Sequence, residues 1–150
     1  MKRKLLILVV VAIFGLYVLS MSASSPTNIG ISNGKLAPLP ESPNAVSTQS
    51  DDRQRTMEPL KMSGSAKAAI EQLAMLIADM PRTHIVNRSD NYLHVEFTSL
   101  IFRFVDDVEF HADESSGQIH FRSASRVGHS DMGANRKRME VITRNWDGIQ

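Results

Sequence analysis

Apolar residues recur at three- and four-residue steps between positions 65 and 80, and this spacing predicts an amphipathic helix. The series is Ala66, Ala69, Ile70, Leu73, Leu76, Ile77 and Met80. Pro81 ends the helix, because proline lacks the N–H group that another turn would need. A second helix is expected from about residue 130 to residue 145, with Ser130 or Asp131 as its N-cap.

Four segments between these helices alternate apolar and polar residues, which is the period of a strand with two different faces. They are residues 83–86, 92–98, 102–110 and 119–125. Turn-forming residues separate them, so the connections have hairpin length and the strands are antiparallel. The order predicts an α+β fold, with an antiparallel sheet of about four strands and helices packed on one face.

The hairpin of residues 102–110 and 118–126 has one register that both matches its apolar faces and centres its turn. In that register Asp107 lies opposite Arg122 as an exposed ion pair, worth about 0–1 kcal/mol. Asp106 lies opposite Ser123 and shares its face with apolar residues. Its carboxylate must therefore find hydrogen-bond donors on that face.

The first residues have the layout of a membrane-targeting helix. A basic cluster at residues 2–4 precedes an uncharged apolar run over residues 5–19, and small residues follow. Cleavage after Ser22 or Ser24 would remove a signal peptide, whereas an uncleaved segment would come close to spanning the ~30 Å hydrocarbon core. Residues 1–21 are thus a signal peptide or a membrane anchor, and in both cases the remainder is exported.

Residues 22–56 are rich in serine, proline, asparagine, glycine and threonine and have no lasting apolar period. The prolines exclude a helix there. We interpret residues 22–34 as a flexible tether. Residues 35–150 then form a single α+β domain, whose irregular N-terminal arm covers residues 35–60.

Charge and cysteine content exclude several functions. The formal net charge is +1, but without the basic cluster at residues 2–4 the chain carries 14 basic and 16 acidic residues, a net charge of −2. This balance argues against nucleic acid as a partner. The chain has no cysteine, which excludes thiol nucleophiles, disulfides and thiolate metal sites.

Several segments carry a resemblance to a known family. They are FVDDVEF at 104–110, RSASRVG at 122–128, SDMGANRKR at 130–138, and, in the arm, GKLAP at 34–38, SPN at 42–44 and EPL at 58–60. Over about residues 30–145 the chain resembles the bacterial and plastid family called domain of unknown function 1499. The resemblance implies export or membrane attachment and no assigned activity. Family members usually carry cysteines where Leu39 and Ala45 stand here.

The candidate binding site gathers around Asp106, on the strand face that leads to the last helix. Its residues are Asp106, Ser123, Ser125, Arg126, Ser130, Asp131, Asn135 and Arg136. An acid, hydroxyls, an amide, helix N–H groups and arginines together suit a polar or anionic ligand. The alternative is an internal network in which the same residues lock the last helix onto the sheet.

No catalytic, metal or cofactor motif emerges from the sequence. The histidines show no metal-ligand spacing. Ser125, His129 and Asp131 are residue types of a hydrolase triad, but no nucleophile elbow holds them. We therefore name no catalytic residue, metal ligand or cofactor.

These observations predict an envelope protein, attached to the membrane through residues 5–21 or released into the periplasm after cleavage. Its domain is expected to be non-enzymatic and to bind a polar or anionic ligand or an envelope partner. Two alternatives stay open. One is a small extracytoplasmic hydrolase that uses Asp106 with Ser123 or Ser125 and an arginine, and the other is a purely structural envelope component.

Overall fold

The protein is described by a computed structural model that covers residues 2–21 and 24–149. The predicted α+β class is confirmed. The helices are α1 (Lys2–Met21), α2 (Ala66–Ala78) and α3 (Ala134–Asp147). The strands are β1 (Ile31–Ser32), β2 (Lys35–Leu36), β3 (Ala45–Ser47), β4 (Leu60–Lys61), β5 (Thr83–Arg88), β6 (Tyr92–Thr98), β7 (Val105–Asp113) and β8 (Gln118–Ser125).

The main sheet has six strands, more than the four of the prediction. The order β3-β8-β7-β6-β5 is antiparallel throughout, and β4 pairs with the same edge of β8 as β3. Three of the four long strands were predicted within two residues of their observed bounds, whereas β7 begins and ends three residues later than predicted. The arm supplies β3 and β4, which are too short to show an alternating pattern. β1 and β2 form a separate two-stranded ribbon.

Helices α2 and α3 cover one face of the sheet and bury the core against it. Leu73 of α2, Phe110 of β7, Phe121 of β8 and Trp146 of α3 are all fully buried in one cluster. The Trp146 indole Nε1 donates to the Lys61 carbonyl at 2.7 Å, which fixes the end of α3 against β4. Burial of such aromatic side chains is a large part of what stabilises a domain of this size.

The hairpin register differs from the prediction by two residues. Glu109, not Asp107, lies opposite Arg122, and Asp106 lies opposite Ser125. The two strands extend to Asp113 and Gln118, so the turn is centred later than expected. The Asp113 carboxylate holds this turn by accepting from the Ser115 N–H at 2.9 Å. Because the shift is even, every side chain keeps its predicted face.

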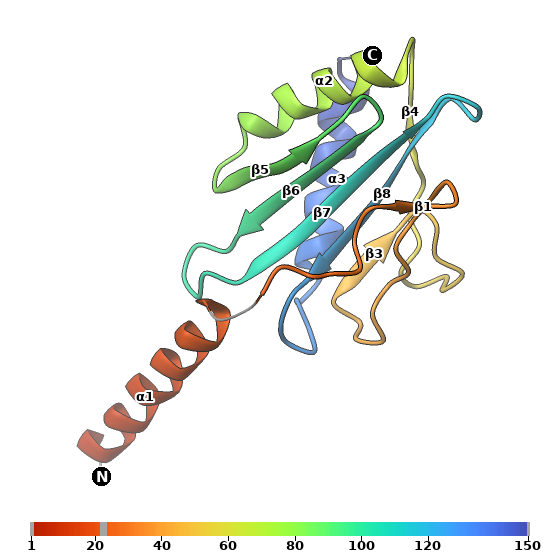
Figure 1. Cartoon of the computed structure of the whole chain (residues 1–150). Helices are drawn as coiled ribbons and strands as arrows, with labels where there is room; N and C mark the ends of the chain where they lie inside the picture. The colour runs from red at the N-terminus through yellow and green to blue at the C-terminus, as the bar shows by residue number, and fades with distance from the viewer. Residues whose placement is uncertain (1, 22–23, 150) are drawn as a thin grey trace.

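On its second face, the part of the sheet formed by β7 and β8 is covered by the N-terminal segment. In Figure 1, β1 crosses in front of the sheet while α3 lies behind it. The Gly30 N–H donates to Glu109 Oε1 at 2.6 Å, and Leu36 of β2 is buried. The described part of the expected tether, which starts at Ser24, therefore contacts the sheet. Ser22, one proposed cleavage position, lies outside the described residues.

Helix α1 projects away from the domain (Figure 1). Its apolar side chains are exposed to solvent at Leu5, Ile7 and Phe14, among others. Within residues 2–21 and 24–149, no helix is long and apolar enough to cross a membrane.

Candidate functional site

The β7–β8 hairpin divides the expected site residues between two faces of the sheet. Asp106, Ser123 and Ser125 lie on the face that α3 covers, because alternate residues of a strand share a face. Arg126 lies on the other face, where its guanidinium contacts Asp107. The expected convergence of Asp106 with Arg126 is therefore wrong.

Asn135 is the centre of the network on the α3 face, and it is fully buried. Its Oδ1 accepts from Ser123 Oγ at 2.5 Å and from Arg138 Nη1 at 2.8 Å. Its Nδ2 donates to Ser125 Oγ at 3.0 Å and to Asp131 Oδ2 at 2.9 Å. Both the donor and the acceptor atom of the amide are therefore hydrogen-bonded within the protein, as is usual for buried polar groups.

Asp106 completes this network through an ion pair with Arg138. Arg138 also lies over the Phe97 ring, with its guanidinium carbon 4.7 Å from the ring centroid. Arg138 was not among the residues expected at the site. Its position three residues after Asn135 places both side chains on one helix face, and this spacing could have identified it.

The loop before α3 caps the helix from within. The Asp131 carboxylate accepts from the Gly133 N–H at 3.0 Å and from the Asn135 N–H at 2.8 Å. Burial would raise the pKa of Asp131, but these hydrogen bonds outweigh it and hold the pKa below its usual value. Ser130 is exposed, and its hydroxyl accepts from the Met132 N–H at 3.3 Å.

The arm is bound to this network at two points. Asn44 Nδ2 donates to the Gly128 carbonyl at 2.7 Å, and the Asn44 carbonyl accepts from Asn135 Nδ2 at 3.0 Å. Arg136 Nη2 donates to the Gln54 carbonyl at 2.7 Å. On this face the geometry is that of an internal network that locks α3 and the arm onto the sheet.

A layer of ionisable side chains lies buried on the opposite face, beneath the N-terminal segment. His94 Nε2 is 2.8 Å from Asp107 Oδ1, and Arg126 donates to both Asp107 oxygens at 2.8 Å. Arg126 also pairs with Glu96. Burial would raise the pKa of Asp107, but the hydrogen bonds from Arg126 and His94 outweigh it and lower the pKa. The hydrogen bond to Asp107 likewise raises the pKa of Arg126.

Glu109 is the central acceptor in the second half of this layer and has no exposed surface. Its Oε1 accepts from the Tyr92 hydroxyl at 2.8 Å, and its Oε2 accepts from Arg122 Nη1 at 3.1 Å. Burial and the adjacent Glu109 charge raise the pKa of Tyr92 well above its usual value, so the phenol stays protonated and donates. The expected exposed pair of Asp107 with Arg122 is therefore wrong in both its partners and its exposure.

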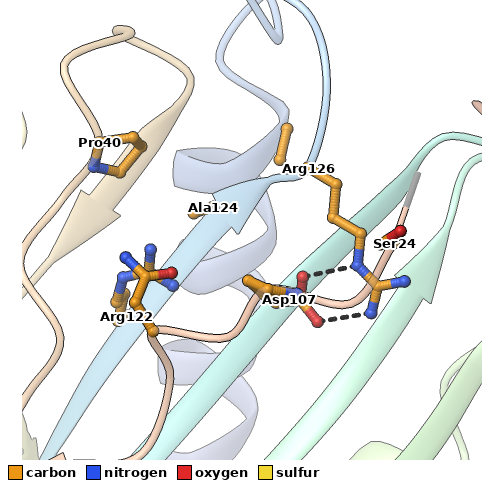
Figure 2. Close-up of a pocket in the computed structure, with 9 residues that line it drawn as sticks. Ser24, Pro40, Asp107, Arg122, Ala124 and Arg126 are labelled. Atoms are coloured by element: carbon orange, nitrogen blue, oxygen red, sulfur yellow. Dashed lines mark hydrogen bonds and ion pairs between the residues drawn. The ribbon is translucent and has the colours of Figure 1, made fainter.

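A cavity of about 250 Å³ opens between this layer and the N-terminal segment, which contributes residues 24–28 and Pro40 of the arm. Its lining residues are Ser24, Pro26, Asn28, Pro40, Asp107, Arg122, Ala124, Ser125 and Arg126. Figure 2 shows Asp107 between Arg122 and Arg126. The Arg122 side chain is 5% exposed, and its Nε is buried with no hydrogen-bond partner among the described residues. A buried donor without a partner costs about 1–3 kcal/mol, so this atom marks a place where an acceptor would be stabilising.

The donor set suits an organic ligand better than a metal ion. Across the part of the chain that the structure describes, no three histidine, aspartate or glutamate side chains are placed to share a metal. The carboxylates of the layer already accept from arginine, tyrosine or histidine.

Sequence reasoning missed the buried layer because its residues looked like a solvated strand face. Ionisable side chains alternate along three successive strands at Tyr92, His94 and Glu96, at Asp107, Glu109 and His111, and at His120 and Arg122. An open antiparallel sheet commonly has such a polar outer face. The sequence pattern did not reveal that the irregular N-terminal segment lies over these side chains and buries them.

The fold and its two polar networks define a small α+β domain in which buried ion pairs and hydrogen bonds join a sheet, a helix and an N-terminal arm. Residues 35–145 match the family described as protein of unknown function (DUF1499), and the chain belongs to this family. Comparisons with curated proteins and with solved structures gave no match.

Proposed function

We propose that the chain is an exported, non-enzymatic domain that binds a small polar ligand in the cavity between its arm and the second face of its sheet. The observation that carries the proposal is Arg122, which lines the cavity and whose buried Nε donor has no partner among the described residues. Buried guanidinium groups are seldom left with an unused N–H, because each lost hydrogen bond costs free energy.

The size of the cavity limits the ligand. A volume of about 250 Å³ holds roughly eight water molecules at ~30 Å³ each. The ligand is therefore a small molecule or one end group of a larger one.

The charges around the cavity limit the ligand further. Three carboxylates, from Glu96, Asp107 and Glu109, face two guanidinium groups, from Arg122 and Arg126. This arrangement does not favour a multiply charged anion. The ligand is expected to present a carbonyl or carboxylate oxygen that accepts from Arg122 Nε.

Residues 1–21 carry the proposed export signal. Their basic start and apolar run have the layout of a signal peptide or an N-terminal anchor. In this proposal the domain works outside the cytoplasm, attached to the membrane or released into the periplasm. A reporter fused after Gln150 is then active only outside the cytoplasm.

The hydrolase alternative finds less support. Ser123 Oγ donates to Asn135 Oδ1, and an amide oxygen is not a base that can accept its proton for catalysis. Asp106 is paired with Arg138. These contacts favour a structural role for the residues that a hydrolase would have to use.

Thermal unfolding of the full chain with acetate, acetamide or phosphate, at ionic strength matched with sodium chloride, tests the proposal. A ligand that binds only the folded state raises the unfolding temperature. We expect a saturable rise with acetate or acetamide and none in Arg122→Lys, which keeps the charge facing Glu109 but removes the Nε donor.

Ala124→Leu is a second variant, because it fills the cavity and leaves the Arg122–Glu109 pair intact. It should also abolish the rise. If no probe acts, or if both variants respond like the parent chain, the domain is a purely structural envelope component.

A further inference from the structure

The loop between β6 and β7, residues 99–104, presents apolar side chains to solvent. Leu100 is 69% exposed and Ile101 is 73% exposed. Backbone and side-chain bonds close the loop beneath them: the Ser99 N–H donates to the Phe104 carbonyl at 2.8 Å, and the Phe104 N–H donates to Ser99 Oγ at 2.9 Å. A single exposed leucine is common on protein surfaces, but two adjacent apolar residues at a closed loop tip are less so.

This loop lies at the end of the sheet where α1 joins the domain. Thr98 pairs with Val105, and the Arg126 N–H donates to the Val105 carbonyl at 3.1 Å, so these three residues form one row across the sheet end. Ser24 borders the same cavity as Arg126. Since three residues span at most about 11 Å, Met21 at the end of α1 is close to this row. In Figure 1 the end of α1 meets the sheet beside the β6–β7 loop.

The surroundings of the loop are basic. Residues 99–104 contain Arg103 and no acidic residue. Arg82 and Lys137 border one cavity with Ser99, next to the loop, and both are exposed. An apolar tip within a ring of basic side chains is the pattern of a segment that enters the interface of an anionic lipid bilayer.

A second apolar side chain is exposed at the same end of the domain. Met132 lies in the loop that runs from Arg126, at the end of β8, to the start of α3, and it is 91% exposed. An apolar residue is also exposed near the C-terminal end of α3. It is Met75 of α2, which is 64% exposed and borders a cavity with Arg144 of α3. The charged residues that line this cavity are Arg144 and the acidic Asp79, so its surroundings are not basic and Met75 serves as a reference.

We propose that the loop at residues 99–104 inserts into the surface of an anionic phospholipid membrane and seats this end of the domain on the bilayer. The occupant is lipid and not a second protein, because the exposed basic side chains of Arg82, Arg103 and Lys137 lie around the apolar tip and the apolar helix α1 ends at the same end of the sheet. The inference is independent of the ligand cavity. It shares with the proposed function only the expectation that residues 1–21 bring the chain to a membrane.

Because the chain has no cysteine, a single introduced cysteine can carry an environment-sensitive fluorophore. The full chain with Ile101→Cys or Met75→Cys is labelled and added to vesicles of equal parts phosphatidylcholine and phosphatidylglycerol. We expect a blue-shifted emission, and quenching by lipid-bound spin labels, for the label at position 101. The label at position 75 should show neither.

A third label tests the contribution of the loop directly. A fluorophore at Met132→Cys should respond to the same vesicles, and its response should fall in the background of Leu100→Ser with Ile101→Ser. Both serine substitutions are at exposed positions and leave the core unchanged. Vesicles of phosphatidylcholine alone should give a weaker response, because they lack the anionic charge that Arg103 and its neighbours attract.

Three results would overturn the inference. If the chain floats with the vesicles but the label at 101 does not respond, residues 1–21 alone bind lipid and the loop does not. If the label shifts without vesicles as protein concentration rises, a second copy covers the loop. If the chain does not float at all, the proposed membrane attachment fails as well, while the ligand cavity stays open to its own test.

Discussion

Arg122 donates to Glu109 through Nη1 at 3.1 Å, while its Nε has no partner within the described residues. Both side chains are almost completely buried, at 5% and 0% exposed. Since burying a charge is costly unless it is paired, the two residues depend on each other. Arg122 also lines the cavity, so its contact with Glu109 joins the stability of the sheet to the proposed binding site.

Removing one partner of this pair should therefore be strongly destabilising. Arg122→Ala leaves the Glu109 carboxylate buried without a counter-charge, and we expect a loss of about 3–5 kcal/mol in the free energy of unfolding. Urea denaturation measures this loss. Lys67→Ala is the control, because its pair with Asp90 is 63% and 81% exposed and should be worth about 0–1 kcal/mol. Similar losses in the two variants would contradict the assignment of a buried pair.

The network on the α3 face makes its own prediction. Asp106→Asn removes the charge that faces Arg138, and we expect a loss of about 1–3 kcal/mol. Asp90→Asn, at an 81% exposed side chain, should change stability by less than about 0.5 kcal/mol. Chemical denaturation of the two variants compares their free energies of unfolding. An Asp106→Asn protein as stable as its control would mean that Asp106 does not hold the helix.

Two histidines on the second face should make stability depend on pH. Burial lowers the pKa of His111, and burial together with the His111 charge lowers the pKa of His120. The unfolded chain binds protons at about pH 6.5 while the folded chain does not, so stability falls as pH drops from about 7 towards 5. The slope is at most about 1.4 kcal/mol per pH unit for each histidine.

His111→Phe should reduce this slope, since phenylalanine does not titrate. His129→Gln is the control, because His129 is exposed. Unfolding free energies measured at pH 7, 6 and 5 give the slopes. If both variants keep the slope of the parent chain, another group titrates.

The attachment of the N-terminal segment to the sheet depends on Gly30. Its φ of 101° lies in the region that other residues rarely adopt, while nothing lies within 4 Å of an added Cβ. Gly30→Ala should therefore cost about 1–2 kcal/mol through backbone strain alone. It should also speed hydrogen exchange at residue 30, whose N–H donates to Glu109. Gly148→Ala, at a φ of −75°, should have neither effect; equal effects would contradict the strain argument.

The sequence predicted the long elements because each has a sustained period. The apolar series from Ala66 to Ile77 and the alternation along β6 and β7 needed no tertiary information. The short strands of the arm follow from pairing with β8, which no local pattern reveals. The same limit explains the site, since Asp107 and Arg122 were placed on the correct face but the segment that buries them was read as a tether.

Two of the segments that carry the family resemblance take part in the network on the α3 face. Asn44, in the segment at 42–44, donates a hydrogen bond to the Gly128 carbonyl. Asn135, in the segment at 130–138, forms hydrogen bonds with Ser123 and Ser125. Four of the eight residues first expected to bind a ligand, Ser123, Ser125, Asp131 and Asn135, thus bind one another. The candidate site moved to the other face, where the buried Arg122 Nε has no partner among the described residues.

The Arg122 Nε–H group itself provides the most direct test of ligand binding. In a nitrogen-15 NMR spectrum of the full chain in detergent micelles, its resonance is the arginine Nε–H signal that Arg122→Lys removes. We predict that acetate or acetamide shifts this signal saturably at constant ionic strength, while the signal of Arg126, already bonded to Asp107, moves less. A signal of Arg122 that no probe shifts more than sodium chloride does would contradict the proposed binding site.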